Sequence, residues 1–376
     1  GSILLGSPFS IDSEGGDLEF EDSHLVFSST GPVSTLSGGA LFMRGSVVEG
    51  GAGWWTNGTA VMMRDATLVD QVGEWTFSNS TADLDGMAGI GGDGLRLWNM
   101  TGSVTSSSWT AGSSGLSIDR CAGMSLRDLS FLDNGMDMGV FGDARSHFEH
   151  YVENVSLTFG MLQIMLGLNG AALENVTGSL YLVDCHDVVV RSSFFGRAGN
   201  GLALVDSTEM EIYGNAFDNC SVGLLAIDTD GLVWGNDLLF NREQAVLVRS
   251  NITFGREYPI GGNHWSDMVG SDTKSGEAQD LAGADGIFDA AYDIDDIYDQ
   301  YPKVERCSLA FDLLEASFTM DAAQANRVEE VRFISTSSSG IGLSNWTWDL
   351  GDGSHAYGET VEPTYSSLGV MTVRWT

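Results

Sequence analysis

The chain of 376 residues has only five prolines and only two lysines, Lys274 and Lys303. Its 17 basic residues stand against 52 acidic ones, which gives a formal net charge of −35. Such a surface repels phosphate backbones, so the sequence predicts no nucleic-acid partner. It also opposes anionic membranes and anionic polysaccharides unless divalent cations bridge the two surfaces. An acidic, lysine-poor surface suits a saline habitat and keeps a protein soluble.

Long hydrophobic runs and helical periodicity are also nearly missing. The longest apolar stretch, from Met161 to Leu173, is short and is interrupted by Gln163 and Asn169. A spanning helix needs about 20 apolar residues, so the sequence predicts no membrane span. The part from Met161 to Leu168 is the one place where we expect a short helix. Because the chain starts at Gly1 without Met and stops inside an expected strand, we expect a longer polypeptide.

Cysteine is scarce, and no Cys-x-x-Cys spacing occurs, which argues against a zinc or redox motif. Cys185 and Cys220 fall in neighbouring repeats of the ladder described next. Two interpretations stay open for them, a disulfide between the two residues or buried free thiols. The four cysteines are Cys121, Cys185, Cys220 and Cys307.

What the chain has instead is a ladder with a period of 22 residues. Val183-Asp184, Val205-Asp206 and Ile227-Asp228 open three successive units at this spacing. Apolar residues recur in the same columns of these units, namely Val188, Met210 and Leu232, then Val190, Ile212 and Trp234. The short alternating pattern indicates strands. A period in this range predicts a solenoid, because one coil cannot bury its own apolar side and coils must therefore stack.

Two stretches carry a family resemblance. The segment from Gly223 to Asn236, with the sequence GLLAIDTDGLVWGN, resembles right-handed parallel β-helix repeats of the NosD-like type. Residues 262–302 contain the motifs GNHWSD, DGIFD and DQYP and are similar to the cap that ends many such helices. The resemblance covers residues 90–305 and implies a right-handed parallel β-helix. Because NosD-like proteins are associated with copper delivery, it also implies a copper-related role.

A second resemblance begins near Phe318. The run from Trp346 to Ser354, with the sequence WTWDLGDGS, and the later Tyr365 are similar to a PKD domain, which implies a small immunoglobulin-like β-sandwich. We therefore expect an all-β chain. Residues 1–255 form the right-handed parallel β-helix (solenoid), residues 256–310 an Asp-rich cap or linker, and residues 311–376 the PKD-like sandwich.

Half of the sixteen asparagines begin an Asn-x-Ser/Thr sequon. Chance would give about three in a chain with this content of Ser and Thr. The excess indicates an N-glycosylated, secreted or surface protein. The alternative is that asparagine-rich turns lie next to strands rich in Ser and Thr. The eight sequon residues are Asn57, Asn79, Asn99, Asn154, Asn175, Asn219, Asn251 and Asn345.

Two groups of aspartates are candidate Ca²⁺ ligands, because Ca²⁺ prefers clustered carboxylate oxygens. A column of Asp119, Asp184, Asp206 and Asp228 would stack carboxylates about 5 Å apart. In the cap, the candidates are Asp285, Asp289, Asp293, Asp295 and Asp299. The alternative for both groups is that each aspartate caps a turn and faces solvent.

Soft ligands for copper are also present, although methionine is more often a core filler. The candidates are Met136, Met138, His147, His150, Met161 and Met165. For catalysis, Asp184 and Asp206 beside Arg191 or Arg197 would form the acidic groove that β-helix lyases and hydrolases use. Trp54 and Trp55 lie in a Gly-rich segment and are candidates for stacking on sugar rings.

From these observations we predict an extracellular prokaryotic surface protein, archaeal or bacterial. Its role would be structural or adhesive, with a rigid glycosylated module that contacts glycans, proteins or neighbouring subunits in a lattice or filament. The expected cofactor is Ca²⁺. The alternatives are a polysaccharide lyase or glycoside hydrolase and a copper-binding accessory protein.

Overall fold

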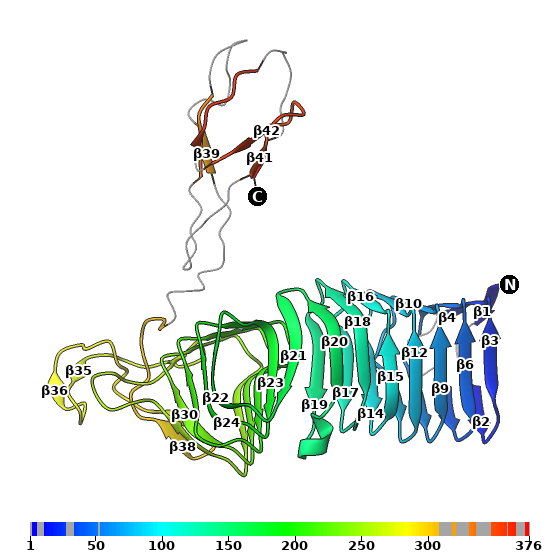
Figure 1. The fold of residues 1–376 in the computed structure, drawn as a ribbon, viewed down its shortest axis with the longest axis horizontal. Helices are drawn as coiled ribbons and strands as arrows, with labels where there is room; N and C mark the ends of the chain where they lie inside the picture. Colours follow the sequence, from blue (N-terminus) through cyan, green and yellow to red (C-terminus); the bar gives the residue numbers. More distant parts are fainter. Residues whose placement is uncertain are drawn as a thin grey trace. The chain divides into compact units, whose positions relative to one another are not determined.

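The computed structural model describes residues 2–5, 11–27, 34–51, 53–307, 318–320, 331–335, 347–358, 360–365 and 373–375. The chain separates into two compact units, Gly1–Cys307 and Ser308–Thr376. Nearly all regular structure is β-strand, and the only helix among the described residues is the 3₁₀ turn η1 (Arg145–His147). The chain is therefore all-β, as predicted (Figure 1).

The first segment of the larger unit is a stack of coils, each of which contributes one strand to each of three parallel columns (Figure 1). The first column is β2 (Ile11–Glu14), β5 (Ser34–Ser37), β8 (Trp54–Asn57), β11 (Trp75–Ser78), β14 (Leu95–Trp98), β17 (Ser114–Asp119) and β19 (Met136–Phe141). The second is β3 (Leu18–Glu21), β6 (Ala40–Arg44), β9 (Ala60–Arg64), β12 (Thr81–Asp85), β15 (Thr101–Thr105), β18 (Ser125–Leu132) and β20 (Tyr151–Leu157). The third is β1 (Ser2–Leu5), β4 (His24–Phe27), β7 (Val47–Gly50), β10 (Thr67–Val69), β13 (Ala88–Ile90) and β16 (Ser108–Thr110). We call the first column sheet 2; the other two belong to one large sheet, which we call sheet 1.

Side chains alternate between the core and the solvent along these strands, which is the pattern that predicts half-buried β-structure. In β9, for example, Val61 and Met63 are fully buried and the residues between them are not. Aromatic rings from neighbouring coils stack inside, as Trp109 does on Phe131 with 5.1 Å between ring centres. This inward packing confirms that the coils bury their apolar sides against one another.

A chain reversal joins the first segment to the second. Strand β20 pairs with β21 (Gly160–Leu166) in an antiparallel hairpin, and β21 then pairs in parallel with β23 (Thr177–Val183). The short helix expected from Met161 to Leu168 is therefore wrong. Both edges of this segment border strands, and a helix would leave the backbone groups of those neighbours without ladder partners.

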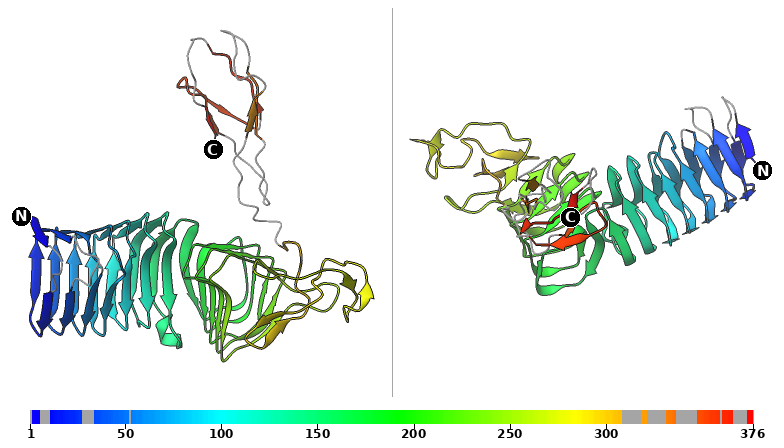
Figure 2. Two further views of the ribbon diagram at one scale, coloured as in Figure 1. Left: turned by 180° about the vertical axis from the view of Figure 1, so that it is seen from behind. Right: turned by 90° about the horizontal axis from the view of Figure 1, so that it is seen from above.

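The second segment continues in coils of 21 or 22 residues. Sheet 1 continues through β23, β25 (Phe194–Gly196), β26 (Asn200–Val205), β28 (Ala216–Asp218), β29 (Val222–Ile227), β31 (Asp237–Leu239), β32 (Glu243–Val248) and β34 (His264–Trp265). A new lateral sheet, which we call sheet 3, consists of β22 (Asn169–Glu174), β24 (His186–Arg191), β27 (Met210–Tyr213), β30 (Asp230–Trp234) and β33 (Asn251–Phe254). Figure 2 shows how the coils of this segment are turned relative to those of the first.

Sheet 1 is buried on both faces just after the reversal. Leu182 and Leu204 point into the core of the second segment, while Tyr181 and Ala203 belong to the core of the first. The Tyr181 hydroxyl donates or accepts at 3.0 Å from the Val140 backbone nitrogen, whose N–H is the donor. The two segments are thus packed together through apolar contacts and buried hydrogen bonds.

One feature of the expected ladder is misplaced. Asp184, Asp206 and Asp228 follow β23, β26 and β29 of sheet 1 and do stack on consecutive coils. Asp119, however, ends β17 in sheet 2, where its neighbours are Trp98 and Phe141. The prediction that Asp119 shares the column is therefore wrong, because the reversal near residue 160 separates the two lateral sheets.

The cap closes the second core. Trp265 stacks on Tyr292 with 4.2 Å between ring centres, and Ile294 is buried beneath them. The four cysteines are free, three of them buried, so the disulfide alternative for Cys185 and Cys220 is not realised. The remaining strands of the unit are β35 (Lys274–Ser275), β36 (Leu281–Ala282), β37 (Tyr292–Ile294) and β38 (Ile297–Asp299).

The smaller unit has two antiparallel sheets around its own core. Trp348 is fully buried, its indole N–H donates to the Gly358 carbonyl at 2.9 Å, and the Tyr365 hydroxyl donates to the Leu350 carbonyl at 3.2 Å. The sheets are β39 (Phe318–Met320), β40 (Phe333–Ser335) and β43 (Thr360–Val361), and β42 (His355–Tyr357), β41 (Thr347–Asp349) and β44 (Arg374–Trp375). The PKD-like assignment of this unit stays a prediction.

Candidate functional site

The outward face of sheet 3 carries the candidate site. Because strands pair in register, outward residues of successive coils form columns. Val189, Glu211, Leu232 and Thr253 occupy one such column on β24, β27, β30 and β33. Their inward neighbours, such as Ile212 and Val233, are buried in the core and hold the strands in place. The sequence period therefore determines which side chains meet on this face.

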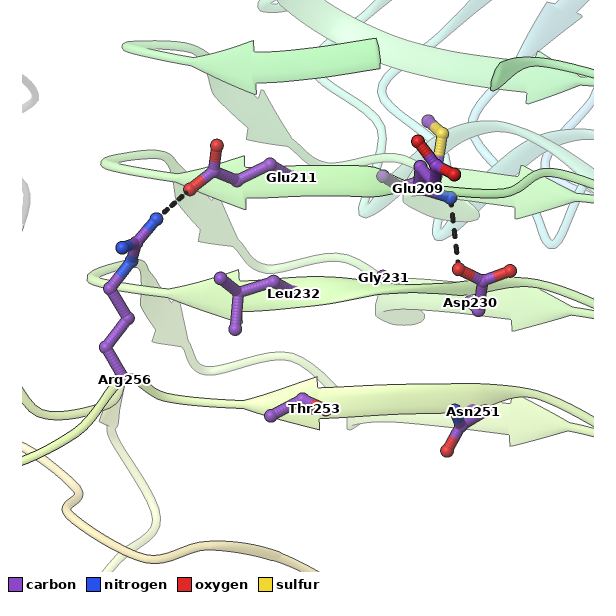
Figure 3. Close-up of a pocket in the computed structure, with 9 residues that line it drawn as sticks. Glu209, Glu211, Asp230, Gly231, Leu232, Asn251, Thr253 and Arg256 are labelled. Atoms are coloured by element: carbon purple, nitrogen blue, oxygen red, sulfur yellow. Dashed lines mark hydrogen bonds and ion pairs between the residues drawn. The ribbon is translucent and has the colours of Figure 1, made fainter. Parts of the chain in front are cut away.

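A hollow of about 410 Å³ opens on this face (Figure 3), and we call it the acidic concavity. Three carboxylates line it together with one guanidinium, an amide and a hydroxyl. The lining residues are Glu209, Met210, Glu211, Asp230, Gly231, Leu232, Asn251, Thr253 and Arg256. Two contacts tie its wall together. The Glu209 backbone N–H donates to Asp230 Oδ1 at 3.1 Å, and Arg256 Nη2 lies 2.5 Å from Glu211 Oε1 (Figure 3).

A stack of unlike side chains borders the hollow. Tyr213 and Trp234 stack with 4.8 Å between ring centres and an interplanar angle of 16°. The Arg256 guanidinium lies 4.7 Å from the centre of the Trp234 ring, and the Trp234 indole N–H donates to Glu211 Oε1 at 3.1 Å. At the other end, Arg191 donates to the Tyr213 hydroxyl at 2.9 Å. Tyr213 and Arg256 therefore cover both faces of the Trp234 ring, which leaves its edge for a ligand.

The chemistry of the concavity fits a neutral polyhydroxylated ligand. Carboxylates accept hydrogen bonds, the Asn251 amide both donates and accepts, and the Thr253 hydroxyl does both as well. Three carboxylates against one guanidinium leave the hollow negative, so it repels a polyanion. Sequence reasoning missed Glu209, Glu211, Asp230 and Arg256. The signal for the first three was their place in the 22-residue ladder, but carboxylates occur throughout this acidic chain.

The two predicted sugar-binding tryptophans have opposite fates. Trp54 is 0% exposed and stacks on Trp75 with 5.0 Å between ring centres, so the prediction that it binds a glycan is wrong. The strand alternation explains the difference, since adjacent residues of β8 point to opposite faces. Trp55 is 61% exposed on the outward face of sheet 2 and stays a candidate.

The five cap aspartates do not come together as a Ca²⁺ site. The buried Asp299 accepts hydrogen bonds from the Asn263 backbone and the Trp265 indole, at 2.7 and 3.0 Å. Asp289 accepts from Thr273 and Lys274 in another turn. Asp285 and Asp293 likewise bond to nearby backbone N–H groups, and Asp295 is a turn residue with positive φ. Within the described residues, no group of three or more His, Cys, Asp or Glu side chains is placed to hold a metal ion.

The hydrogen bonds of these aspartates also account for their pKa values. Burial raises the pKa of Asp299, while the hydrogen bonds from Asn263 and Trp265 oppose that effect. For Asp289, desolvation is outweighed by several hydrogen bonds, led by those from Thr273, and the pKa falls to about 2. Both patterns are those of turn-capping carboxylates.

The expected catalytic pairing is not formed. Asp184 lies 3.1 Å from Arg145, while Arg191 is on sheet 3 and pairs with Glu174. Arg197 has its guanidinium 5.3 Å from the centre of the Phe159 ring. Asp184 and Asp206 therefore share a column without either predicted arginine beside them.

Seven of the eight sequon asparagines lie in the described part of the chain, and all seven side chains are exposed. Five of them, Asn79, Asn99, Asn154, Asn175 and Asn219, have positive φ. Asparagine tolerates this left-handed conformation better than most residues do, so turn geometry gives a second reason for their presence. Asn345 lies outside the described residues.

Geometry and topology together define the chain as a parallel β-helix protein. Residues 74–270 match the model of the family described as "Periplasmic copper-binding protein (NosD)", and the chain therefore belongs to the NosD family. Among solved structures, it is similar to the A-module of the mannuronan C-5 epimerase AlgE6 from Azotobacter vinelandii. The identity is 10%, the coverage is 68% of this chain and 91% of that chain, and the TM-score is 0.24. At that TM-score the similarity supports no further conclusion.

Comparison with curated proteins finds no significant match. Along the described residues, no helix has both the length and the apolar character that crossing a membrane requires. The family description is periplasmic, which fits a place outside the cytoplasm.

The side chains of this chain do not fit the copper of the family description. Met138 lies in the first core and Met165 packs against the second. The Met136 sulfur takes a hydrogen bond from Ser221, at 3.3 Å. His147 Nδ1 faces Asp143 at 3.3 Å, and His150 Nδ1 accepts from the Met124 backbone N–H at 3.2 Å. Because these soft donors have separate surroundings, no copper chemistry is derived for them.

Proposed function

We propose that this protein works outside the cytoplasm as a β-helical surface module that contacts neutral glycans through the acidic concavity. Membership of a family described as periplasmic supports the location. The exposed sequon asparagines are in keeping with a glycosylated surface protein. Adhesion to glycans and assembly with neighbouring subunits are parts of this proposal.

The observation that carries the proposal is the make-up of the acidic concavity. The side chains of Glu209, Asp230, Asn251 and Thr253 line a hollow of about 410 Å³ with groups that hydrogen-bond to sugar hydroxyls. Its volume lies within the range of roughly 300–1,000 Å³ that ligand sites have. Because the side chains project from paired strands, the site is largely ordered before a ligand arrives, which lowers the entropic cost of binding.

The test is binding of the full chain to an array of neutral, aminated and acidic oligosaccharides, followed by titration of the best neutral ligand. Leu232 lies at the centre of the concavity and points outward, so Leu232→Trp fills the hollow without changing the core. We expect this variant to lose at least about tenfold in affinity, which is about 1.4 kcal/mol.

Thr76→Trp is the matched control, since Thr76 is an outward, half-buried strand residue on sheet 2. We expect it to bind as the wild type does. Equal binding by the Leu232→Trp variant, or the absence of any neutral ligand, would refute the proposal. Release of reducing ends during incubation would favour the enzyme alternative instead.

A further inference from the structure

A second hollow, of about 400 Å³, meets the acidic concavity at Trp234. Its lining includes Tyr213, Trp234, Ile260, Lys303, Glu305 and Arg306. Arg256, at the edge of the acidic concavity in Figure 3, lies over the Trp234 ring, which itself lines the second hollow. We call this second hollow the basic concavity. A ligand that crosses the Arg256–Trp234 pair reaches both.

The charge of the basic concavity is opposite to that of its neighbour. Two cations, Lys303 and Arg306, stand against one carboxylate, Glu305, in a chain whose net charge is −35. Lys303 Nζ has one long hydrogen bond, at 3.4 Å to the Pro259 carbonyl, and an ammonium group has three donors. Burial raises the pKa of Cys307, on the same wall, to about 12, so its thiol stays neutral and leaves the positive charge uncancelled.

Glycines keep the floor of the basic concavity open. Gly214, Gly235 and Gly286 all line it, with φ of +63°, +62° and +84°. A Cβ added at any of the three would meet no atom within 4 Å. The backbone is therefore accessible there, and a ligand can approach it closely.

We propose that the basic concavity binds the carboxylate of a sugar acid, a single uronic acid carried by an otherwise neutral glycan. This inference rests on the proposed function and names its substrate class. Lys303 supplies a point charge for the carboxylate, while Ile260 and the ring edges of Tyr213 and Trp234 pack against the C–H face of the sugar. The acidic concavity next to it repels further carboxylates, so a repeating polyanion is excluded.

The experiment is ligand-observed saturation-transfer NMR on the full chain with D-glucuronate, its methyl ester and acetate as probes. We expect glucuronate to bind at least tenfold more tightly than the ester or acetate. Lys303→Ala is expected to reduce glucuronate affinity about tenfold, as loss of a hydrogen bond to a charged group does. Lys274→Ala removes the only other lysine, on β35, and is expected to change nothing.

Gly235→Asn provides a second variant, because asparagine tolerates positive φ and its side chain would occupy the open floor. Gly58→Asn is its control, since Gly58 has φ of +67° and equally open surroundings on the first segment. We expect loss of glucuronate binding in the first variant only. Equal binding of glucuronate and its ester, equal binding of acetate, or equal losses in variant and control would overturn the inference.

The two proposals fail separately. If neutral oligosaccharides bind and the Leu232→Trp variant loses them, but glucuronate shows no dependence on Lys303, then only the uronic acid inference is wrong. If glucuronate binds through Lys303 and no neutral oligosaccharide binds, the proposed glycan contact at the acidic concavity is wrong.

Discussion

The outward faces of sheet 2 and sheet 3 use the same coil spacing in different ways. On sheet 2, Asn57, Asn79 and Asn99 form a ladder of like residues, in which each amide donates to the preceding one at 2.7 and 2.8 Å. On sheet 3, the column alternates unlike groups, with Tyr213 and Trp234 stacked between arginines. Strands about 4.8 Å apart permit either arrangement. The inward columns determine the fold, and the outward columns are left to determine binding.

Replacing Trp54 or Trp55 of β8 separates the inward from the outward role within one strand. Trp54→Ala removes a fully buried ring that stacks on Trp75, and we expect a loss of about 3–5 kcal/mol in the free energy of unfolding. Trp55→Ala removes an exposed ring and is expected to change that free energy by less than about 0.5 kcal/mol. Urea denaturation followed by circular dichroism measures both. Equal effects would contradict the alternation of β8.

Acidification tests the packing at the end of the first segment, where His150 is 7% exposed. Burial lowers the pKa of this imidazole from 6.5 to about 4, and the charge of the nearby His147 acts in the same direction. The folded state therefore binds fewer protons than the unfolded state. The resulting stability is fully present above pH 6.5 and is lost as the pH falls towards 4, by about 3 kcal/mol.

Urea titrations of the wild type and of His150→Gln at pH 7 and pH 4 measure this loss, and we expect the variant to lose about 3 kcal/mol less on acidification. His24→Gln is the control, because the His24 side chain is 42% exposed beside Glu49. Parallel pH dependence of the wild type and His150→Gln would show that His150 does not titrate between the folded and unfolded states.

The smallest expected effect concerns the stack on sheet 3. Arg256→Ala removes a cation–π contact with Trp234 and an ion pair with Glu211, but the arginine side chain is 40% exposed. We expect a loss of about 1 kcal/mol in the free energy of unfolding, because solvent screens such pairs. Arg44→Ala removes an exposed pair with Glu21 at 3.9 Å and is expected to cost less than about 0.5 kcal/mol. Urea midpoints that fall equally would mean that the ring stack adds nothing.

The sequence predicted the coils well where its period is regular. The columns that contain Val190 and Ile212, or Phe195 and Phe217, are inward columns of the structure. Prediction failed near residue 160, because an antiparallel hairpin has no period to detect and the pairing partner of β21 lies in the next coil.

The candidate site was less accessible to prediction than the fold. A shift of one residue in register would bring a side chain to the opposite face, and in a chain with 52 acidic residues no single carboxylate is distinctive. Lys303 was noticed as one of two lysines, yet its place beside Trp234 depends on how the cap folds back onto sheet 3.

The sequence by itself determined that this protein is a stacked parallel β-helix with an acidic surface, because period and alternation follow from local strand geometry. Only the tertiary structure decided that Trp54 is buried, that Asp119 is outside the aspartate column, and that two hollows of opposite charge meet at Trp234. These features depend on contacts between residues that are a coil or more apart in the chain, and the local pattern of a sequence does not encode such contacts.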